Sequence, residues 1–269
     1  MVVNNILDSY RMKIPLLLIF FLPIVFTNCN KNPPSETSQG RVPASEIKYE
    51  IEAKKKCNKG DIYECVNAGD YLRLAENIPE AKKFYKKACE AGEMVGCLSL
   101  GYIEEENGNI VEAKRLYLKA CEAGEMSGCR FLGELEANNG NKENGKKFYS
   151  KACDGGDKLG CYNLGWLLER EGNISEAEII YSKGCNSQNN FTCFNLISLG
   201  NKEQIKGNIA EAKRLYSKVC DAGRSHGCKL IGDLEIKKGN IKRARKWFNK
   251  ACDLGDNNSC KALMKMKKP

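Results

Sequence analysis

The nonapeptide CEAGEMVGC, at residues 89–97, decides the fold of this 269-residue chain. Its two cysteines lie eight residues apart, and the same C-x7-C spacing occurs seven times: Cys57/Cys65, Cys89/Cys97, Cys121/Cys129, Cys153/Cys161, Cys185/Cys193, Cys220/Cys228 and Cys252/Cys260. Successive pairs begin 32 residues apart, except for one interval of 35 residues between Cys185 and Cys220. Spacing this regular predicts an array of repeated units.

Each cysteine pair is expected to form a disulfide across a turn. Within one helix, residues eight apart are separated by about 12 Å, beyond the roughly 7 Å that a disulfide can span. A glycine three residues after the first cysteine, such as Gly92, suits a helix C-terminus, and the next helix then begins near the second cysteine. Zinc is the alternative, but the chain has no C-x-x-C and a single histidine, His226. We therefore predict seven local disulfides, no metal, and an oxidising compartment.

The residues from 97 to 129 show what one repeat contains. Gly101 lies on the apolar face of a first helix, Gly108-Asn109 ends it and starts the next, and Tyr117 lies on the apolar stripe of the second helix. The asparagine recurs in all six units, where its side chain is expected to cap the second helix: Asn77, Asn109, Asn141, Asn173, Asn208 and Asn240. Four units also have a glutamate three residues later, as in a capping box: Glu80, Glu112, Glu176 and Glu211.

Two further positions recur in the second helix. The aromatic position is occupied by Tyr85, Tyr117, Tyr149, Tyr181, Tyr216 and Phe248. A lysine stands two residues before the cysteine that ends each second helix, where the helix dipole favours a cation. These lysines are Lys87, Lys119, Lys151, Lys183, Lys218 and Lys250.

These units predict an all-α protein, a right-handed α/α solenoid of stacked helical hairpins with one disulfide per repeat. The array is expected to fill residues 46–269 with six helix pairs, capped by a helix before Cys57 and a half unit after Cys260. The fifth unit is irregular, because its turn at residues 186–192 lacks glycine and three extra residues precede Asn208. We expect a local break in curvature and faster amide exchange there.

At this level of detail the repeats resemble a known group. The Leu-Gly pair of the first helix and the sequence EAKRLYLKACEAG at residues 112–124 are similar to Sel-one-like repeats, relatives of the tetratricopeptide repeat. The C-x7-C framework resembles the Helicobacter cysteine-rich protein family over about residues 57–260. The present units are shorter, and Gly-Asn-Ile replaces that family's longer Gly-x-Gly connection. The resemblance implies the solenoid fold, and it raises a β-lactam-binding or β-lactam-hydrolysing activity as a hypothesis.

The start of the chain has the layout of an export signal. Residues 16–26 form an apolar run of 11 residues preceded by Arg11 and Lys13, too short to span a bilayer. Phe26-Thr27-Asn28-Cys29 resembles a bacterial lipobox. We predict a lipoprotein signal peptide at residues 1–28, a lipid anchor on Cys29 and a flexible tether at residues 29–45, with translation starting at Met1 or Met12. Ordinary signal cleavage, which would leave Cys29 as a free thiol, is the alternative.

The chemistry that an enzyme would need was sought along the chain. Ser45-Glu46-Ile47-Lys48 is the only S-x-x-K sequence, and the supporting S-D-N and K-T-G motifs of serine β-lactamases do not occur. His226 lies in a turn, and the glycines stand singly at helix ends rather than in a phosphate-binding loop. No catalytic residue and no cofactor are therefore predicted. The formal net charge of +9 is spread along the helices among acids, which favours a solvated surface over nucleic-acid binding.

Candidate binding residues are those that vary between repeats on the first helix, since structural positions repeat and binding positions need not. They occur one and five residues after the second cysteine of a pair: Leu98/Tyr102, Arg130/Glu134, Tyr162/Trp166, Lys229/Asp233, and Phe194 in the irregular unit. We predict a concave partner groove that includes Arg130, Glu134, Tyr162, Trp166 and Phe194. The alternative is that the aromatic side chains fill a wider gap between repeats.

The function predicted from these features is an extracytoplasmic scaffold that binds a protein or peptide. It would be anchored by its lipid in the bacterial outer membrane or periplasm, or at the cell surface. The alternatives are a protein that binds β-lactams or peptidoglycan fragments, with weak β-lactamase activity, and a secreted factor recognised by host cells.

Overall fold

The computed structural model describes residues 44–185 and 191–266, and side chains from residue 48 onward. The predicted signal peptide, lipid anchor and tether lie outside the described residues, except for the last two tether positions, which are helical. The described residues form only helices: α2 (Ala44–Asn58), α3 (Ile62–Leu74), α4 (Ile78–Glu90), α5 (Met94–Glu106), α6 (Ile110–Glu122), α7 (Met126–Asn138), α8 (Lys142–Asp154), α9 (Lys158–Arg170), α10 (Ile174–Gly184), α11 (Phe191–Ile205), α12 (Ile209–Asp221), α13 (Ser225–Lys237), α14 (Ile241–Asp253) and α15 (Asn257–Met266).

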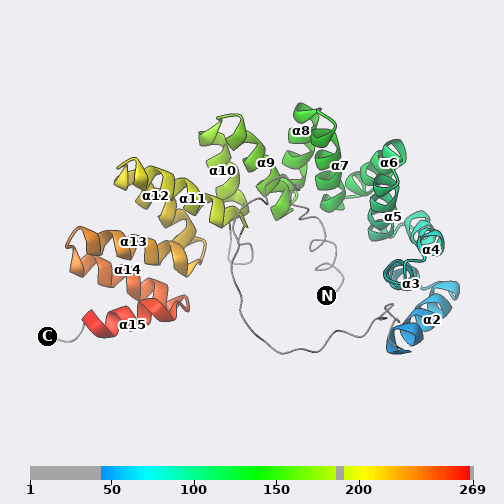
Figure 1. Ribbon diagram of the computed structural model, residues 1–269, viewed down its shortest axis with the longest axis horizontal. Helices are drawn as coiled ribbons and strands as arrows, with labels where there is room; N and C mark the ends of the chain where they lie inside the picture. Colours follow the sequence, from blue (N-terminus) through cyan, green and yellow to red (C-terminus); the bar gives the residue numbers. More distant parts are fainter. Residues whose placement is uncertain (1–43, 186–190, 267–269) are drawn as a thin grey trace, which may run out of the picture. The chain divides into compact units, whose positions relative to one another are not determined.

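Each helix packs against the next one along the chain (Figure 1), and successive first helices also touch, as α7 and α9 do. The helices pair as hairpins α3/α4 to α13/α14, with α2 before them and α15 after them. The predicted all-α solenoid of stacked helical hairpins is therefore confirmed.

The predicted disulfides are all formed, one at each junction between hairpins or between a hairpin and a cap. Their Cα–Cα distances are 4.5–4.9 Å, well within the reach of a disulfide. The bonds follow numerical order: Cys57–Cys65, Cys89–Cys97, Cys121–Cys129, Cys153–Cys161, Cys185–Cys193, Cys220–Cys228 and Cys252–Cys260.

The second cysteine of each pair lies further inside its helix than the sequence predicted. The helix was expected to begin near this cysteine, but α7 begins at Met126, three residues before Cys129. Side chains in a helix point back toward its N-terminus, so a cysteine in the first turn still reaches the end of the preceding helix. In α11 the cysteine, Cys193, is the third residue of its helix. The fourth helical position is occupied in the same way as in α7 by Cys65, Cys97, Cys161, Cys228 and Cys260.

The sulfur atoms of these second cysteines also pack against backbone carbonyls. The Sγ atom of Cys129 lies 3.7 Å from the carbonyl oxygen of its own partner, Cys121, and that of Cys161 lies 3.7 Å from the carbonyl oxygen of Cys153. The first junction differs, because Cys65 Sγ lies 3.5 Å from the carbonyl oxygen of Asp61, the N-cap residue of α3. A bonded sulfur has no proton to donate, so these are packing contacts and not hydrogen bonds of a free thiol.

The glycine three residues after the first cysteine ends its helix as predicted at six of the seven junctions. At the second junction Gly92 has φ +94°, a left-handed conformation that favours glycine. The Gly92 N–H donates to the Cys89 carbonyl and the Glu93 N–H to the Ala88 carbonyl, which satisfies the end of α4. The predicted helix end at this glycine is thus confirmed.

At four junctions a glycine stands just before the second cysteine (Gly96, Gly128, Gly160 and Gly227), and its role there is close packing. A Cβ added at Gly96 would lie 2.6 Å from the Ala88 Cβ, so α4 and α5 cross too closely for a side chain. At the fifth junction the larger residue is on α11 and the glycine is on α10. There Thr192 occupies the glycine position, and Gly184 replaces the alanine opposite it.

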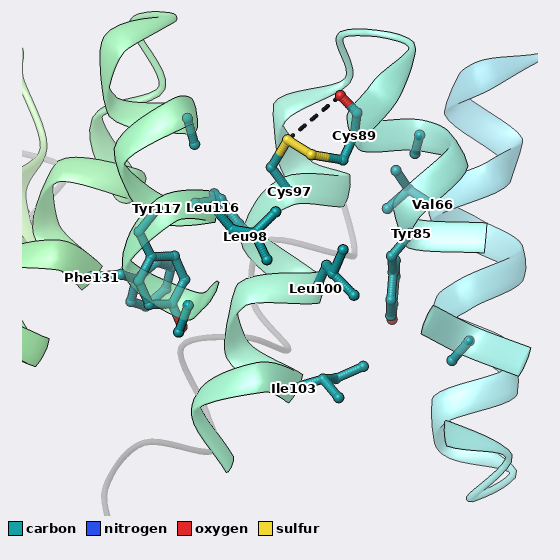
Figure 2. Packing of buried hydrophobic residues seen from close by; sticks show 14 of the residues in the cluster. Val66, Tyr85, Cys89, Cys97, Leu98, Leu100, Ile103, Leu116, Tyr117 and Phe131 are labelled. Atoms are coloured by element: carbon teal, nitrogen blue, oxygen red, sulfur yellow. Dashed lines mark hydrogen bonds between the residues drawn. A yellow bond between two sulfur atoms is a disulfide. The ribbon is translucent and has the colours of Figure 1, made fainter. Parts of the chain in front are cut away.

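The recurrent tyrosine packs on the recurrent glycine of its own hairpin. Tyr117 is fully buried, and a Cβ added at Gly101 would lie 2.7 Å from its Cε1 atom. Figure 2 shows Tyr117 beside Phe131 of the next hairpin, at a ring-centroid distance of 5.3 Å. The Tyr117 hydroxyl donates to Glu105 at 2.8 Å. The same aromatic-on-glycine contact recurs in every hairpin: Tyr85 on Gly69, Tyr149 on Gly133, Tyr181 on Gly165, Tyr216 on Gly200 and Phe248 on Gly232.

The predicted capping role of the asparagines is wrong in five of the six hairpins. Asn77 caps α4 by accepting from the Glu80 N–H at 3.4 Å, but the side chains of the five others accept no cap bond. Four of these donate instead to a glutamate five residues earlier in the chain: Asn109 to Glu104, Asn141 to Glu136, Asn208 to Glu203 and Asn240 to Glu235. A hydrogen bond to an ionised carboxylate is stronger than one between neutral groups, so these asparagine side chains bind the glutamate. Asn77 has Leu72, and not a glutamate, five residues earlier, and it keeps the cap bond. Asn173 likewise has Leu168 five residues earlier but makes no cap bond, which nothing in the structure explains.

Three of these glutamates also join neighbouring hairpins. Lys82 of α4 reaches Glu104 of α5 at 2.6 Å, and Lys114 reaches Glu136 at 2.7 Å. Lys213 and Glu235 form the same pair in the sixth unit. Burial raises the pKa of Glu104, but the hydrogen bonds from Lys82 and Asn109 outweigh it, and the net pKa is lowered. The carboxylate therefore stays ionised between the two hairpins.

Five of the six recurrent lysines of the second helices also contact the preceding hairpin or cap: Lys87, Lys119, Lys183, Lys218 and Lys250. Lys119 donates to the carbonyl of Cys89 at 2.9 Å, and Lys87 donates to that of Cys57 at 2.9 Å. Each recurrent lysine lies in the last turn of its own helix, as predicted for the dipole, and Lys87 and Lys119 also reach the C-terminal end of the preceding unit's helix.

The three extra residues of the fifth unit lie inside α11, not in a loop. Gly200 follows Cys193 by seven residues, whereas Gly101 follows Cys97 by four. Three residues add about 300° of rotation, nearly one turn, so Gly200 still faces Tyr216. The predicted change in curvature and in amide exchange stays a prediction, and residues 186–190 lie outside the described residues.

A charge cluster joins α10 and α12, the second helices on either side of the irregular helix α11. Glu178 of α10 accepts from Arg214 of α12 at 2.8 Å and from Lys218 at 2.6 Å. These bonds, that of Arg214 first, lower the pKa of Glu178 to about 2. Glu178 is therefore a carboxylate at any neutral or mildly acidic pH, and it links α10 to α12 directly.

Candidate functional site: an aromatic surface on α9 and α11

Four aromatic side chains lie at adjacent places on the first helices of the fourth and fifth hairpins. The ring of Tyr162, on α9, meets the ring of Phe191, on α11, edge to face at a centroid distance of 6.1 Å. Trp166 lies four residues after Tyr162, and Phe194 lies three residues after Phe191, so each is one turn further along the same helix face. The helices α9 and α11 touch, and they run in the same direction because the chain reverses twice between them. The turn of α9 that carries Trp166 and the turn of α11 that carries Phe194 therefore lie side by side, as do the turns that carry Tyr162 and Phe191. We call these four residues the aromatic surface.

The aromatic surface is open to solvent. The exposed fractions are 44% for Trp166, 55% for Phe191 and 67% for Phe194, and Tyr162 is half-buried. The guanidinium of Arg170 lies 4.7 Å from the centroid of the Trp166 ring, which adds a cation at its edge. The side chains do not fill a closed gap between hairpins, because three of the four are more than two-fifths exposed.

A salt bridge further along the two helices holds α9 and α11 in register. Lys202 of α11 lies 2.7 Å from one carboxylate oxygen of Glu169 of α9. The hydroxyl of Tyr181 donates to the other oxygen at 3.0 Å. The two helices are thus positioned relative to each other by polar contacts outside the aromatic surface.

Arg130 and Glu134 were predicted in the same groove, and the structure places them differently. Arg130 is buried; its Nε lies 3.3 Å from Asp157, and its guanidinium stacks 4.2 Å from the centroid of Phe131. Asp157 also accepts from the Gly160 N–H at 2.6 Å and so caps α9. Arg130 therefore supports the start of α9 from the preceding hairpin. Glu134 is half-buried on α7. The three aromatic members of the predicted set lie on the neighbouring helices α9 and α11, and a partner groove that includes them stays a prediction.

Phe191 was not identified from the sequence. It stands two residues before a second cysteine, where the regular units have Val95, Ser127 and Leu159. Its place in the irregular turn gave no repeat position against which to judge it. The signal that could have found it is its three-residue spacing from Phe194, which puts both rings on one helix face.

The residues considered for catalysis lie on helices that are far apart along the chain. Ser45 and Lys48 lie on α2, and His226 is exposed in the first turn of α13. Within the part of the chain that the structure describes, no cluster of three or more histidine, cysteine, aspartate or glutamate side chains could hold a metal ion. None of the described helices is both long and apolar enough to cross a membrane.

Comparison with known families identifies the repeats. The Sel1 repeat model matches residues 65–93, 97–125, 129–157, 199–223 and 228–256, more than half of the chain, and a tetratricopeptide repeat model matches residues 160–191. The chain therefore belongs to the Sel1 repeat family. This confirms the resemblance to Sel-one-like repeats, and the disulfides at every junction fit a cysteine-rich member. A search of curated protein sequences gave no match.

Solved structures with related helix arrangements have low sequence identity to this chain. A protective antigen of uropathogenic Escherichia coli, c5321, which displays an SLR fold, is 22% identical with a TM-score of 0.49; the match covers 81% of this chain and 54% of that protein. This chain thus spans about half the length of that structure. YrrB, a TPR protein with an unusual peptide-binding site, is 19% identical with a TM-score of 0.40, over 80% of this chain and 97% of YrrB.

Proposed function

We propose that this chain is a protein-interaction scaffold of the bacterial envelope that binds a protein or peptide across the aromatic surface. Repeat solenoids bind partners over extended surfaces made by one helix of each unit. Buried aromatic side chains dominate the energy of such interfaces, and a solvent-exposed cluster of them is costly unless it is used. The seven disulfides are typical of an oxidising compartment outside the cytoplasm.

The single observation that supports this proposal is that four aromatic side chains, two of them in contact, lie on the neighbouring helices α9 and α11. Other large apolar side chains with high exposure, such as Val111, Ile179 and Ile205, occur on both kinds of helix, and isolated exposure of this kind is normal for a soluble surface. The aromatic surface instead combines tyrosine, tryptophan and phenylalanine with the arginine at its edge. This composition is typical of the central part of a protein interface.

Replacing both Trp166 and Phe194 by alanine is expected to weaken partner binding by at least about tenfold, because hot-spot aromatic residues contribute roughly 2 kcal/mol or more each. The measurement is the amount of each envelope protein recovered with the oxidised chain, followed by titration of the recovered partner. The matched control is Val111→Ala with Ile179→Ala, which removes similar exposed apolar area from second helices. Equal recovery with the two double variants would contradict the proposal. Circular dichroism establishes that both variants stay folded.

We further propose that the chain is held in the envelope by a lipid on Cys29. The apolar run at residues 16–26 and the lipobox-like residues before Cys29 support this proposal. Changing Cys29 to serine is expected to move most of the protein from the membrane fraction to the soluble fraction, with Thr27→Ser as the matched control. Unchanged membrane association of the Cys29 variant, or an unmodified N-terminus elsewhere in the mature protein, would rule out the anchor.

A further inference from the structure

The segment from 236 to 252 carries an unusual concentration of charge. It contains seven basic side chains and no acidic one, and all seven are exposed: Lys237, Lys238, Lys242, Arg243, Arg245, Lys246 and Lys250. It covers the end of α13 and nearly all of α14 (orange in Figure 1). The nearest acids along the chain are Glu235, which is buried, and Asp253. We call residues 236–252 the basic segment.

The charge of the basic segment is not required for the stability of α14. The corresponding helices α4, α6 and α12 have a glutamate at the third helical position, where it favours the helix dipole, and α14 has Arg243 there. In α6 that glutamate, Glu112, accepts two hydrogen bonds from Arg115. In α14 Lys246 stands at the Arg115 position and meets Arg243 instead of an acid. The helix therefore has an unfavourable pattern of charge at its N-terminus.

Most of these cations form no ion pair, although the charge of Arg243 helps to lower the pKa of Glu235. Lys250 pairs with Asp221 at 2.7 Å, but the other six side chains form no ion pair or hydrogen bond with any residue that the structure describes. Five cations line an open hollow of about 820 Å³ together with Trp247, Asn249 and one acid, Asp253. The cations are Lys242, Arg243, Arg245, Lys246 and Lys250. Trp247 is half-buried against the Cys220–Cys228 disulfide and Ala251.

We infer that the basic segment is a docking surface for phosphate-bearing anionic lipid headgroups. Each lysine or arginine near an anionic bilayer contributes attraction, and clusters of four to eight such residues are typical of surfaces that bind these lipids. The cores of protein interfaces are depleted in lysine and need apolar anchors, whereas the accessible side chains here are almost all cations. The disulfides indicate a location outside the cytoplasm, where lipid headgroups are the abundant polyanion at a membrane and nucleic acid is not. This inference concerns a face other than the aromatic surface and does not depend on a partner bound there.

The test uses the oxidised full chain with vesicles of phosphatidylcholine, with and without phosphatidylglycerol. The variant carries Lys242→Gln, Arg243→Gln, Arg245→Gln and Lys246→Gln, which keep good helix formers at exposed and unpaired positions. The matched control carries Lys55→Gln, Lys59→Gln, Lys147→Gln and Lys151→Gln, four exposed lysines without an ion pair among the described residues, so the net charge falls equally. The apolar run near the start of the chain is the same in all three proteins.

We expect the basic-segment variant to bind phosphatidylglycerol vesicles at least about tenfold more weakly than the wild type, and the control variant to keep most of its affinity. The difference should disappear on phosphatidylcholine alone and at high salt, where the charges are screened. Equal loss in both variants would overturn the inference, because net charge alone would then explain binding. It would also be overturned if the wild type preferred polyglutamate to the vesicles, which would indicate an acidic protein, or if inorganic phosphate displaced it, which would indicate a small-anion site.

Discussion

Complete reduction of the seven disulfides is expected to unfold the repeat array at about 37 °C. Each bridge closes a short loop and stabilises the fold by about 2.5 kcal/mol in the chain-entropy model. The sum over seven bridges exceeds the roughly 5–15 kcal/mol by which proteins are ordinarily stable. The bridges also lie where one hairpin packs on the next, so their loss acts on every inter-hairpin contact at once. The measurement is thermal unfolding by circular dichroism with and without reductant, with thiols counted to establish that reduction is complete.

A single-junction variant provides the control for this prediction. Cys89→Ser with Cys97→Ser is expected to lower stability by only about 2–3 kcal/mol and to leave the helices intact. A fully reduced protein that melts at the same temperature as the oxidised one would contradict the view that the disulfides, rather than the apolar core, supply the margin of stability.

Replacing Tyr117 by alanine is expected to lower the free energy of unfolding by about 3–5 kcal/mol. The ring is fully buried between Gly101 of its own hairpin and Phe131 of the next, so its removal leaves a cavity at a contact between units. It also removes a donor from Glu105. The measurement is urea unfolding, with Leu118→Ala, a partly exposed neighbour on α6, as the matched control. An equal and small effect of both substitutions would show that the aromatic-on-glycine contact does not hold the hairpins together.

The repeat positions of the chain could be predicted from the sequence because repetition itself identifies them. The C-x7-C spacing gave the junctions, and the recurrence of Gly101 and Tyr117 gave the two faces that pack. Contacts that cross between units could not be predicted in this way. Asn109 was assigned to its own helix terminus, because the sequence does not show that the Glu104 carboxylate lies within its reach or that Lys82 holds that carboxylate from the preceding hairpin.

The candidate site was predicted in part for the same reason. Variation between repeats selected Tyr162, Trp166 and Phe194, which lie on the neighbouring helices α9 and α11. It also selected Arg130, which is buried against Asp157. A position can vary because it binds a partner or because its local structural neighbour varies, and the sequence does not separate the two. The basic segment was overlooked because the charge was judged over the whole chain, in which acids and bases alternate, and not over α14 alone.

The central claim, that a partner binds the aromatic surface, is tested most directly by site-specific photo-crosslinking in intact envelopes. Benzoyl-phenylalanine is placed at Phe194 in one protein and at Ile179, a similarly exposed position on the second helix α10, in another. Our account predicts a discrete cross-linked partner from position 194 that is lost when Trp166 is also changed to alanine, and only background from position 179. The same adducts from both positions, or a partner captured from position 179 alone, would contradict it.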